Sequence, residues 1–200
     1  MWNSYQEDST GTAVIYGGRT GTCQQYAEWI GEHRDAELIE LQSAKLSRIK
    51  SYKTLVYILP IYDGQIEGLG SLSINYPKLM KVTRSYADDM GGAEGSKRIA
   101  VLAVGLTPEK EAYRSGLLDL PSVLEEVPVY YAMGRYLPEK ADSRTALRLD
   151  ILRKAMDKDP ESVPSWFRNL CAGMTDKKTE GLDLTDPAYV DPIFDLIDGR

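Results

Sequence analysis

The feature that most constrains the fold is Leu55–Tyr62, the longest unbroken run of apolar residues in the chain. A strand is expected at Thr54–Pro60, and both of its faces would be buried because apolar residues occupy successive positions. A strand buried on both faces is typical of the centre of a parallel sheet, since helices cover each side of such a sheet. The chain is therefore expected to form an α/β domain around this strand.

Four more segments have the composition of strands, and segments with helical periodicity lie between and after them. The expected strands are 12–16, 36–41, 98–104 and 127–133, and the expected helices are 22–34, 45–51, 72–90, 121–126, 144–158, 165–172 and 191–198. Helix 72–90 is expected to break early at Pro77 or to begin there, because proline lacks the amide hydrogen that an internal helical position needs. Strands that alternate with helices predict βαβ units, right-handed crossovers and a parallel sheet.

The length and composition favour one globular domain. The chain has 200 residues, of which 42% are hydrophobic and 27% are charged, so it is long and apolar enough to bury a full core. Residues 1–11 are expected to form a flexible leader and 12–200 a single domain, with a helical insertion at 134–187 before the C-terminal helix.

The composition also argues against several classes of function. The net charge of −6 is opposite to the basic face that a nucleic-acid partner requires. No apolar run approaches the about 20 residues of a membrane-spanning helix, and the polar N-terminus has no signal-peptide layout, so a cytoplasmic location is expected. Cys23, Cys171 and the single histidine, His33, do not have the spacing of a zinc site or a disulfide framework.

The turn after the first expected strand has the groups that a phosphate site needs. It reads Tyr16-Gly17-Gly18-Arg19-Thr20-Gly21-Thr22-Cys23 and leads directly into the expected helix 22–34. A helix N-terminus offers unpaired amides and partial positive charge, and glycines let the backbone approach an anion closely. Thr20 and Thr22 add hydroxyls, and Arg19 adds a charge. The alternative is an ordinary glycine-rich turn, since the segment matches neither a Walker loop nor GxGxxG.

This turn resembles the flavodoxin signature, in which aromatic-Gly-Ser/Thr-x-Thr-Gly-x-Thr wraps the phosphate of FMN. Tyr26–Ile30, Val104–Pro108 and Gly134–Tyr136 look like those of bacterial flavodoxin-domain proteins of the protoporphyrinogen-oxidase-like branch, and the likeness extends from Thr12 to Ile197. The resemblance implies a flavodoxin-like, three-layer, doubly wound fold with a five-stranded parallel sheet of order 2-1-3-4-5. It also implies FMN as the cofactor, with its phosphate held by Gly18, Arg19, Thr20, Gly21, Thr22 and Cys23.

Two positions depart from the signature. Gly18 stands where the family usually has Ser or Thr, and Cys23 stands where it usually has the last Thr. Each missing hydroxyl removes a hydrogen bond to the phosphate dianion, on the order of 1.5–3 kcal/mol, and Arg19 would compensate if its side chain turned inward. The Cys23 side chain is expected to fill a small space in the core. The alternative is a thiol made reactive by the helix N-terminus.

The resemblance implies that two further loops contact the flavin ring. The implied contacts are Pro60, Ile61, Tyr62, Asp63, Gly64, Gly105, Leu106 and Thr107. Tyr62 would lie against the ring, and the peptide between Asp63 and Gly64 would face its N5 atom and reorient when the flavin is reduced. The alternative for this dipeptide is a simple surface turn, because Asp-Gly readily adopts turn conformations.

The basic, amphipathic segment 144–156 allows two interpretations. Its apolar residues suffice to pack it on the rest of the domain, which is the expected arrangement. The alternative is peripheral contact with a membrane or a quinone, because quinone-linked relatives carry a comparable insertion.

Three functions follow for the whole chain. The first is an FMN-binding redox protein that exchanges electrons with a partner protein, and the second is an FMN-dependent oxidoreductase that acts on a quinone or a porphyrinogen. The third is a binding module that keeps the fold but has lost the flavin. In the first two the cofactor carries the chemistry, so no catalytic side chain and no metal are expected.

Overall fold

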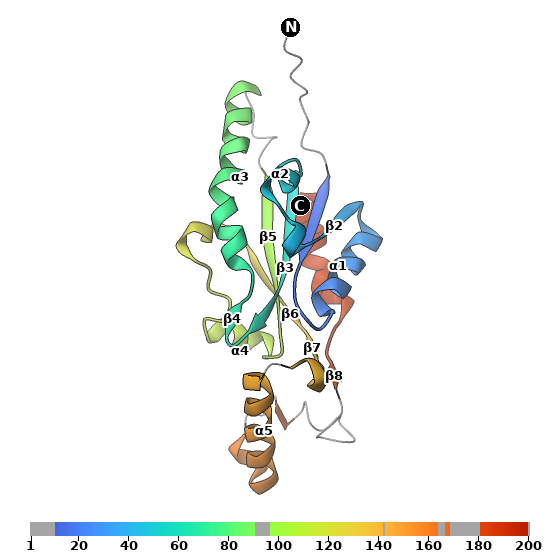
Figure 1. Ribbon diagram of the computed structural model, residues 1–200, viewed down its shortest axis with the longest axis vertical. Coiled ribbons are helices and arrows are strands. Elements are labelled where there is room, and N and C mark those ends of the chain that lie inside the picture. The colour runs from blue at the N-terminus through green and yellow to red at the C-terminus, as the bar shows by residue number, and fades with distance from the viewer. Residues whose placement is uncertain (1–10, 91–96, 142, 164–166, 169–180, 200) are drawn as a thin grey trace.

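The computed structural model describes residues 11–90, 97–141, 143–163, 167–168 and 181–199 (Figure 1). Its centre is a parallel sheet of β1 (Thr12–Tyr16), β2 (Ala36–Glu40), β3 (Thr54–Tyr62), β5 (Arg98–Gly105) and β6 (Val129–Met133). The order across the sheet is β2-β1-β3-β5-β6, so these five strands have the predicted arrangement 2-1-3-4-5. That order is the doubly wound arrangement of flavodoxin-like folds, and the expected fold class is confirmed.

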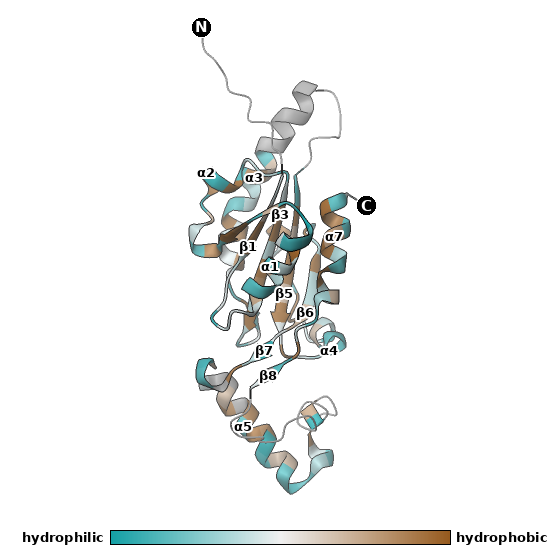
Figure 2. Cartoon of the chain, turned by 90° about the vertical axis from the view of Figure 1, so that its right-hand side faces the viewer, coloured by the Kyte–Doolittle hydropathy of each residue, from teal (hydrophilic) through white to brown (hydrophobic). Residues whose placement is uncertain are grey.

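Helices cover both faces of the sheet and complete three layers (Figures 1 and 2). One face carries α1 (Thr22–His33) and α7 (Asp191–Asp198), and the other carries α2 (Leu46–Ile49) and α3 (Leu69–Met90). Figure 2 shows β1 and β3 in hydrophobic colours along much of their length, whereas the covering helices mix hydrophobic and hydrophilic residues. This difference reflects burial, because the strands are enclosed on both sides while each helix has a face toward solvent.

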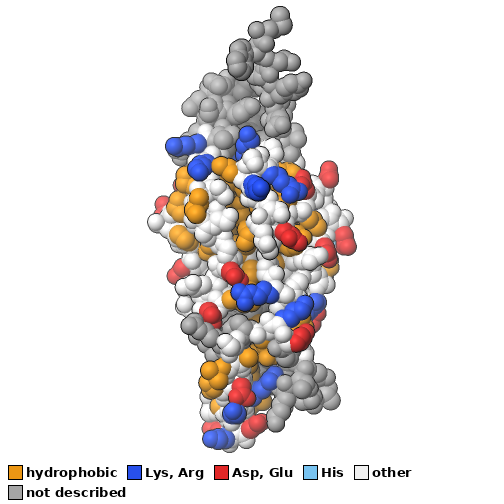
Figure 3. Space-filling view, viewed as in Figure 1, with side chains coloured by type: hydrophobic (Ala, Val, Ile, Leu, Met, Phe, Trp, Pro, Cys, Tyr) orange, Lys and Arg blue, Asp and Glu red, His pale blue; other side chains and the backbone are white. Residues whose placement is uncertain are grey.

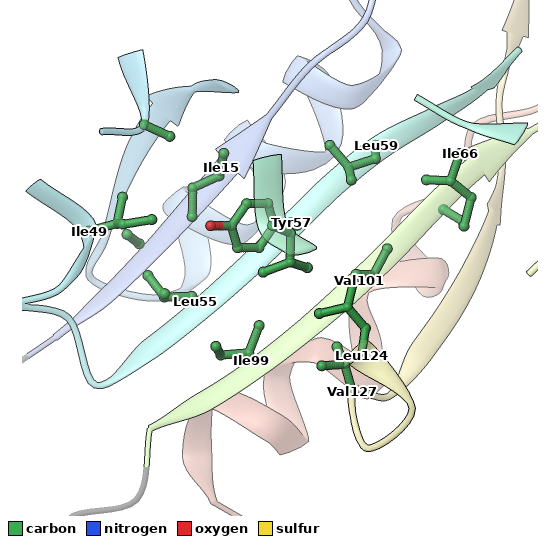
Figure 4. Close-up of a cluster of buried hydrophobic side chains, with 14 of the residues drawn as sticks. Ile15, Ile49, Leu55, Tyr57, Leu59, Ile66, Ile99, Val101, Leu124 and Val127 are labelled. Atoms are coloured by element: carbon green, nitrogen blue, oxygen red, sulfur yellow. The ribbon is translucent and has the colours of Figure 1, made fainter. Parts of the chain in front are cut away.

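The strand β3 separates the two parts of the hydrophobic core. Leu55, Tyr57 and Leu59 face the layer of α2 and α3, whereas Val56 and Ile58 face the layer of α1 and α7. All five side chains are buried, as the continuous apolar sequence of this segment predicted. Figure 4 shows the first part of the core, in which Tyr57 lies among aliphatic side chains from the neighbouring strands and helices.

The expectation for Pro77 was wrong. The helix α3 neither breaks nor begins at this residue but continues through it from Leu69 to Met90. Proline at this position removes the hydrogen bond to the carbonyl oxygen four residues earlier, which destabilises a helix interior by roughly 3 kcal/mol. Leu72 and Leu79, on either side of the proline, are both fully buried against the sheet. Their packing holds the two halves of the helix in line, so tertiary contacts override the local preference.

Three short strands were not predicted. The strand β4 (Gln65–Ile66) pairs antiparallel with the end of β3, and β7 (Arg135–Tyr136) pairs antiparallel with β8 (Leu182–Asp183). Two-residue strands carry too little periodicity to be recognised in a sequence. The pair of β7 and β8 brings the start and the end of the expected insertion at 134–187 side by side.

The segment between these two strands contains a real helix, as expected. It is α5 (Ser143–Lys158), which lies beyond the carboxyl ends of the sheet strands in Figure 1. Of the expected helix at 165–172, only residues 167 and 168 are described, and both are helical. The expected leader lies outside the described residues except for Gly11. The expected helix 121–126 reduces to a single 3-10 turn, Ser122–Leu124.

None of the helices in the described ranges is both long enough and apolar enough to cross a lipid bilayer.

Candidate functional site

The loop between β1 and α1 has the backbone geometry of an anion cradle. Gly18 and Gly21 have φ angles of 114° and 80°, both in the region that favours glycine. Gly21 is the N-cap of α1, and its carbonyl oxygen accepts the first helical hydrogen bond from the amide of Gln25 at 3.0 Å. The amides in the first turn of a helix have no intrahelical acceptor, so the N-terminus of α1 presents several donors in this loop.

The conformation of Gly18 explains the first departure from the flavodoxin signature. A Cβ atom at this residue would lie 3.4 Å from Cγ of Pro60 and 3.6 Å from Sγ of Cys23, which is ordinary contact. The obstacle is therefore the backbone angle and not the space, because a residue with a side chain is strained at a φ of 114°. A serine at this position would bring a hydroxyl only together with that strain.

The hydroxyls of the two threonines of the loop contact each other. Their hydroxyl oxygens are 2.9 Å apart and partly buried, so Thr20 and Thr22 share one hydrogen bond. Each hydroxyl has further bonding capacity, because a hydroxyl can donate one hydrogen bond and accept two. The pair can therefore still donate one hydrogen bond to an anion in the loop.

Arg19 does not turn into the loop. Its guanidinium pairs with Glu67 at 3.4 Å and lies 5.2 Å from the centre of the Tyr62 ring. Its backbone amide donates to the Tyr62 hydroxyl at 3.2 Å. The loop after β1 is thereby tied to the loop after β3, and the amide of Arg19 is engaged within the protein.

Cys23 occupies a closed position in the first turn of α1. Its side chain is buried in the core between the sheet and α1. Burial raises the pKa of the Cys23 thiol to about 12, because the thiolate would lose its hydration. The thiol is protonated at neutral pH, which supports the interpretation of Cys23 as a residue that fills space and opposes the reactive alternative.

The loop after β3 is a tight hairpin. Asp63 and Gly64 have φ angles of 51° and 78° and connect β3 to β4, whose paired residues are Tyr62 and Gln65. Positive φ at both central residues is typical of the two-residue turns that join antiparallel strands. The dipeptide therefore forms the Asp-Gly turn that its sequence favours, and this turn projects at the carboxyl edge of the sheet.

Close packing fixes the loop after β5. The amide of Gly134 donates to the carbonyl oxygen of Gly105 at 2.7 Å, and the Tyr131 hydroxyl donates to the carbonyl oxygen of Thr107. A Cβ atom at Gly105 would lie 2.9 Å from the Tyr131 hydroxyl, so a larger residue there would have to displace this side chain. The ends of β5 and β6 are thus joined, and the backbone of residues 105–107 is held at the edge of the sheet.

These three loops meet in one cleft with a volume of about 290 Å³. Eleven of the predicted site residues line this cleft: Thr20, Thr22, Cys23, Pro60, Ile61, Tyr62, Asp63, Gly64, Gly105, Leu106 and Thr107. The remaining three, Gly18, Arg19 and Gly21, face a second hollow of about 350 Å³ on the other side of the loop. Pro60 lines both spaces, so the loop and this proline form the wall between them.

The cleft also has a wall that the prediction of site residues missed. It is built by the segment after β6 and consists of Gly134, Arg135, Tyr136, Leu137, Lys140, Ala141, Leu149 and Leu152. Gly134-Arg135-Tyr136 stood out in the sequence as part of the resemblance, but its position at the cleft was not inferred. The two leucines of α5 carried no signal beyond the amphipathic pattern of that helix.

Arg135 anchors this wall. Its guanidinium donates to the Gln25 side chain at 2.7 Å and pairs with Asp183 of β8 at 2.6 Å. Burial disfavours the charge of Asp183, but hydrogen bonds from Arg135 and Thr185 outweigh this effect and lower the pKa of the carboxyl group. Arg135 therefore links α1 to both ends of the segment that forms the wall.

Tyr26 of α1 fixes the same wall from the core side. Its side chain is fully buried, and its hydroxyl donates to the carbonyl oxygen of Met133 at 2.7 Å. The same hydroxyl accepts the amide of Asp186 at 3.3 Å. One side chain thus connects α1, the end of β6 and the segment that follows β8.

The charged groups at the cleft balance one another. Among its described lining residues, Arg135 and Lys140 are cationic and Asp63 is anionic, and Arg135 is ion-paired with Asp183. No group of three or more potential metal ligands occurs within the described part of the chain. The arrangement can hold an anionic molecule with a flat apolar part, since tyrosine and aliphatic side chains supply the remaining walls.

No protein-family model matches this chain, and no curated protein matches it in sequence. Solved structures with a similar chain trace include the Trp repressor binding protein from Bacillus subtilis, with 19% sequence identity and a TM-score of 0.43 over 62% of this chain and 86% of that chain. Another is oxidised flavodoxin 2 from Bacillus cereus, with 13% identity and a TM-score of 0.38 over 60% of this chain and 77% of that chain. The fold assignment does not depend on these values, because it follows from the strand order.

Proposed function

We propose that this chain is a flavodoxin-like redox protein that binds FMN and exchanges electrons with a partner protein. The supporting observation is the position of the cleft. It lies at the carboxyl ends of β1, β3 and β5, and the strand order reverses between β1 and β3. Open α/β sheets bind ligands at such a reversal, and the loops there combine a phosphate cradle with apolar walls.

The residues present fit the chemistry of FMN. The amides of the first turn of α1 and the hydroxyls of Thr20 and Thr22 would hold the phosphate, because the helix N-terminus stabilises negative charge. Tyr62 and the backbone of residues 105–107 would border the ring. The volume of about 290 Å³ is close to the lower end of the roughly 300–1,000 Å³ typical of small-molecule sites.

FMN, when bound, supplies the transfer of one or two electrons. The chain would then orient the ring, exclude water from one side of it and set the local charge. Lys140 lines the cleft beside the Arg135–Asp183 ion pair, and a cation near the ring would favour the addition of negative charge to it.

A second candidate function is favoured by the apolar wall that α5 contributes. Leu149 and Leu152 line the cleft from this helix. An apolar wall beside the ring would admit a flat small molecule such as a quinone or a porphyrinogen. We infer on this basis that an oxidoreductase of the protoporphyrinogen-oxidase-like branch is the main alternative to an electron carrier.

A flavin titration tests the proposal. The protein stripped of any bound ligand is expected to quench the fluorescence of FMN with a stoichiometry of about one, and to bind riboflavin, which lacks the phosphate, at least about tenfold more weakly. Equal affinity for FMN and riboflavin would refute the phosphate cradle. Absence of binding would favour the third function, a flavodoxin-fold module without a flavin.

Turnover separates the first two functions. A carrier is expected to require an added reductase, because the described fold contains no second nucleotide-binding domain. Steady oxidation of a nicotinamide by a quinone, with the FMN-loaded protein alone, would favour the enzyme. The partner, the substrate and the cytoplasmic location are further parts of the proposal. Turnover assays with cell extracts would test the partner and the substrate, and fractionation of cells would test the location.

A further inference from the structure

The second hollow lies on the side of the phosphate loop that faces away from the cleft. It has a volume of about 350 Å³ and lies between the end of β2, the loop after β1 and the end of β3. Its polar lining includes Glu40, Gln24, Gln42 and the ion pair of Arg19 with Glu67, and Leu41 and Pro60 supply apolar surface. A hollow with polar groups over an apolar base suits a ligand that is part sugar and part flat ring.

Glu40 is the residue that suggests what this ligand contains. It ends β2, and it lies beside Tyr16 in the parallel register of β1 and β2. Burial and the charge of Glu40 both raise the pKa of the Tyr16 phenol, so this carboxylate acts on the wall of the hollow. In dinucleotide-binding doubly wound folds, an acidic residue about 20 residues after the glycine-rich phosphate turn accepts a hydrogen bond from a ribose hydroxyl, and Glu40 has the corresponding position here although the turn is not GxGxxG.

The hydrogen-bond donors of the loop also favour a dinucleotide. The loop lacks hydroxyls at Gly18 and Cys23, which leaves a doubly charged phosphate monoester with fewer donors than the flavodoxin signature offers. A pyrophosphate bridge carries one charge on each phosphate and extends over both sides of the loop. Arg19 lies on the side of the second hollow, where its exposed ion pair with Glu67 is weak enough to exchange for a phosphate.

We infer that the two spaces on either side of the loop hold the two halves of one dinucleotide, FAD. This inference rests on the proposed flavin site. The flavin half would occupy the cleft, the pyrophosphate would cross the loop near Gly18, and the adenosine half would occupy the second hollow with its ribose hydroxyls on Glu40. Gly18 has a φ of 114°, a conformation that favours glycine and leaves the backbone free to curve around the bridge.

The test compares FMN and FAD binding to the ligand-free full chain by flavin fluorescence. FAD is expected to bind at least about tenfold more tightly than FMN, because a charged hydrogen-bond acceptor in the hollow adds a contact that FMN cannot make. Glu40→Gln is expected to weaken FAD by roughly tenfold and to leave FMN unchanged. Glu32→Gln, which removes the same charge from the exposed face of α1, is the matched control and should change neither affinity.

A second pair of variants tests the hollow by filling it. Gln42 lines the hollow and is exposed, whereas its exposed neighbour Ser43 does not line it. Gln42→Trp is expected to reduce FAD affinity to that of FMN, and Ser43→Trp should have no effect. If Glu40→Gln or Gln42→Trp weakens FMN and FAD equally, the adenosine is not in this hollow and the inference is overturned.

Other outcomes separate the inference from the proposed function. If FMN binds and FAD binds no more tightly, the redox proposal stands and the inference fails. If neither flavin binds, both fail. A last outcome concerns NAD. If Glu40→Gln weakens the binding of NAD by roughly tenfold and leaves the binding of FAD unchanged, the hollow binds a nicotinamide dinucleotide and the inference is overturned.

Discussion

Two regions of the chain line the same cleft, and they differ in how their residues reach it. The loops after β1, β3 and β5 stand at the edge of the sheet because their strands end there. The wall formed by residues 134–152 reaches the cleft only because the segment folds back and is held by contacts distant in sequence. The first region is therefore fixed by the sheet itself, and the second depends on a small number of side-chain bonds.

This difference predicts how each region responds to change. A substitution in the loop after β1 would act directly on the proposed phosphate cradle, so its effect on binding should be large. A substitution in the wall acts through Arg135 or through individual apolar contacts, so its effect should be smaller and should include a loss of stability. Figure 3 shows hydrophobic side chains at the surface around α5, where Leu147 and Ile151 are exposed, consistent with a wall that packs only in part against the domain.

The largest effect is expected from Gly21→Asp. The residue has a φ of 80° and stands at the N-terminus of α1, so the variant places a carboxylate next to the bound phosphate. FMN affinity should fall by roughly 100-fold or more, because the new carboxylate and the phosphate carry like charges and repel each other. Gly21→Asn is the matched control, since asparagine has nearly the same shape and tolerates this conformation without the charge. Equal FMN affinity of the two variants would contradict the phosphate cradle.

The next effect is expected from Arg135→Gln, which removes the bonds to Asp183 and part of the contact with Gln25. The free energy of unfolding should fall by about 1–3 kcal/mol, and FMN affinity should fall about tenfold as the wall loosens. Arg34→Gln is the matched control, because Arg34 makes two 2.9 Å hydrogen bonds with Asp198 away from the cleft. The control should lose stability but keep its FMN affinity; an equal loss of affinity would show that the wall has no special role.

The ion pair of Arg135 with Asp183 should also make the free energy of unfolding depend on pH, which urea unfolding can measure. The pKa of Asp183 is lowered in the folded state, from an ordinary value of 3.8. A carboxyl group with a lowered pKa contributes stability above its unfolded pKa, and that contribution is lost as the pH falls through the folded pKa. The stability difference between the natural chain and Arg135→Gln should therefore be constant near neutral pH and should shrink below pH 3.8.

A smaller gain is expected from Cys23→Ser. The hydroxyl would add a donor at the cleft-facing position where the flavodoxin signature has threonine, and FMN affinity should rise by about threefold to tenfold. Cys23→Ala should leave the affinity unchanged, because the buried thiol is protonated and a weak donor. An unchanged affinity in the serine variant would mean that residue 23 does not reach the phosphate.

The smallest effect is expected from Leu152→Ser in α5, which makes the wall of the cleft more polar. Flavin affinity should fall about threefold, as expected when a modest apolar contact is lost. Ile151→Ser, at a neighbouring position that is 55% exposed, should cause no change. If both variants behave alike in the titration, α5 does not contact the flavin.

The sequence predicted the sheet and the loops that follow its strands. The apolar run of β3 predicted a central strand, and the alternation of strands with helices predicted a parallel sheet. The strand order that the structure shows came from the resemblance to flavodoxins. The residues of the loop after β1 were predicted from a local pattern of glycines and hydroxyls, and those of the other two loops from the resemblance to flavodoxins. The structure brings eleven of these residues to one cleft. Pro77 was misjudged because its local cost is outweighed by Leu72 and Leu79 in the core.

The sequence by itself determined the five strands of the main sheet and the longer helices, since periodicity and the pattern of glycines are local properties. Only the tertiary structure decided that Arg19 turns away from the loop toward Glu67, and that Arg135 joins α1 to β8. It also placed Leu149 and Leu152 at the cleft and opened a second hollow beside Glu40. These features depend on contacts between residues far apart in the chain, and such contacts leave no periodic trace in the sequence.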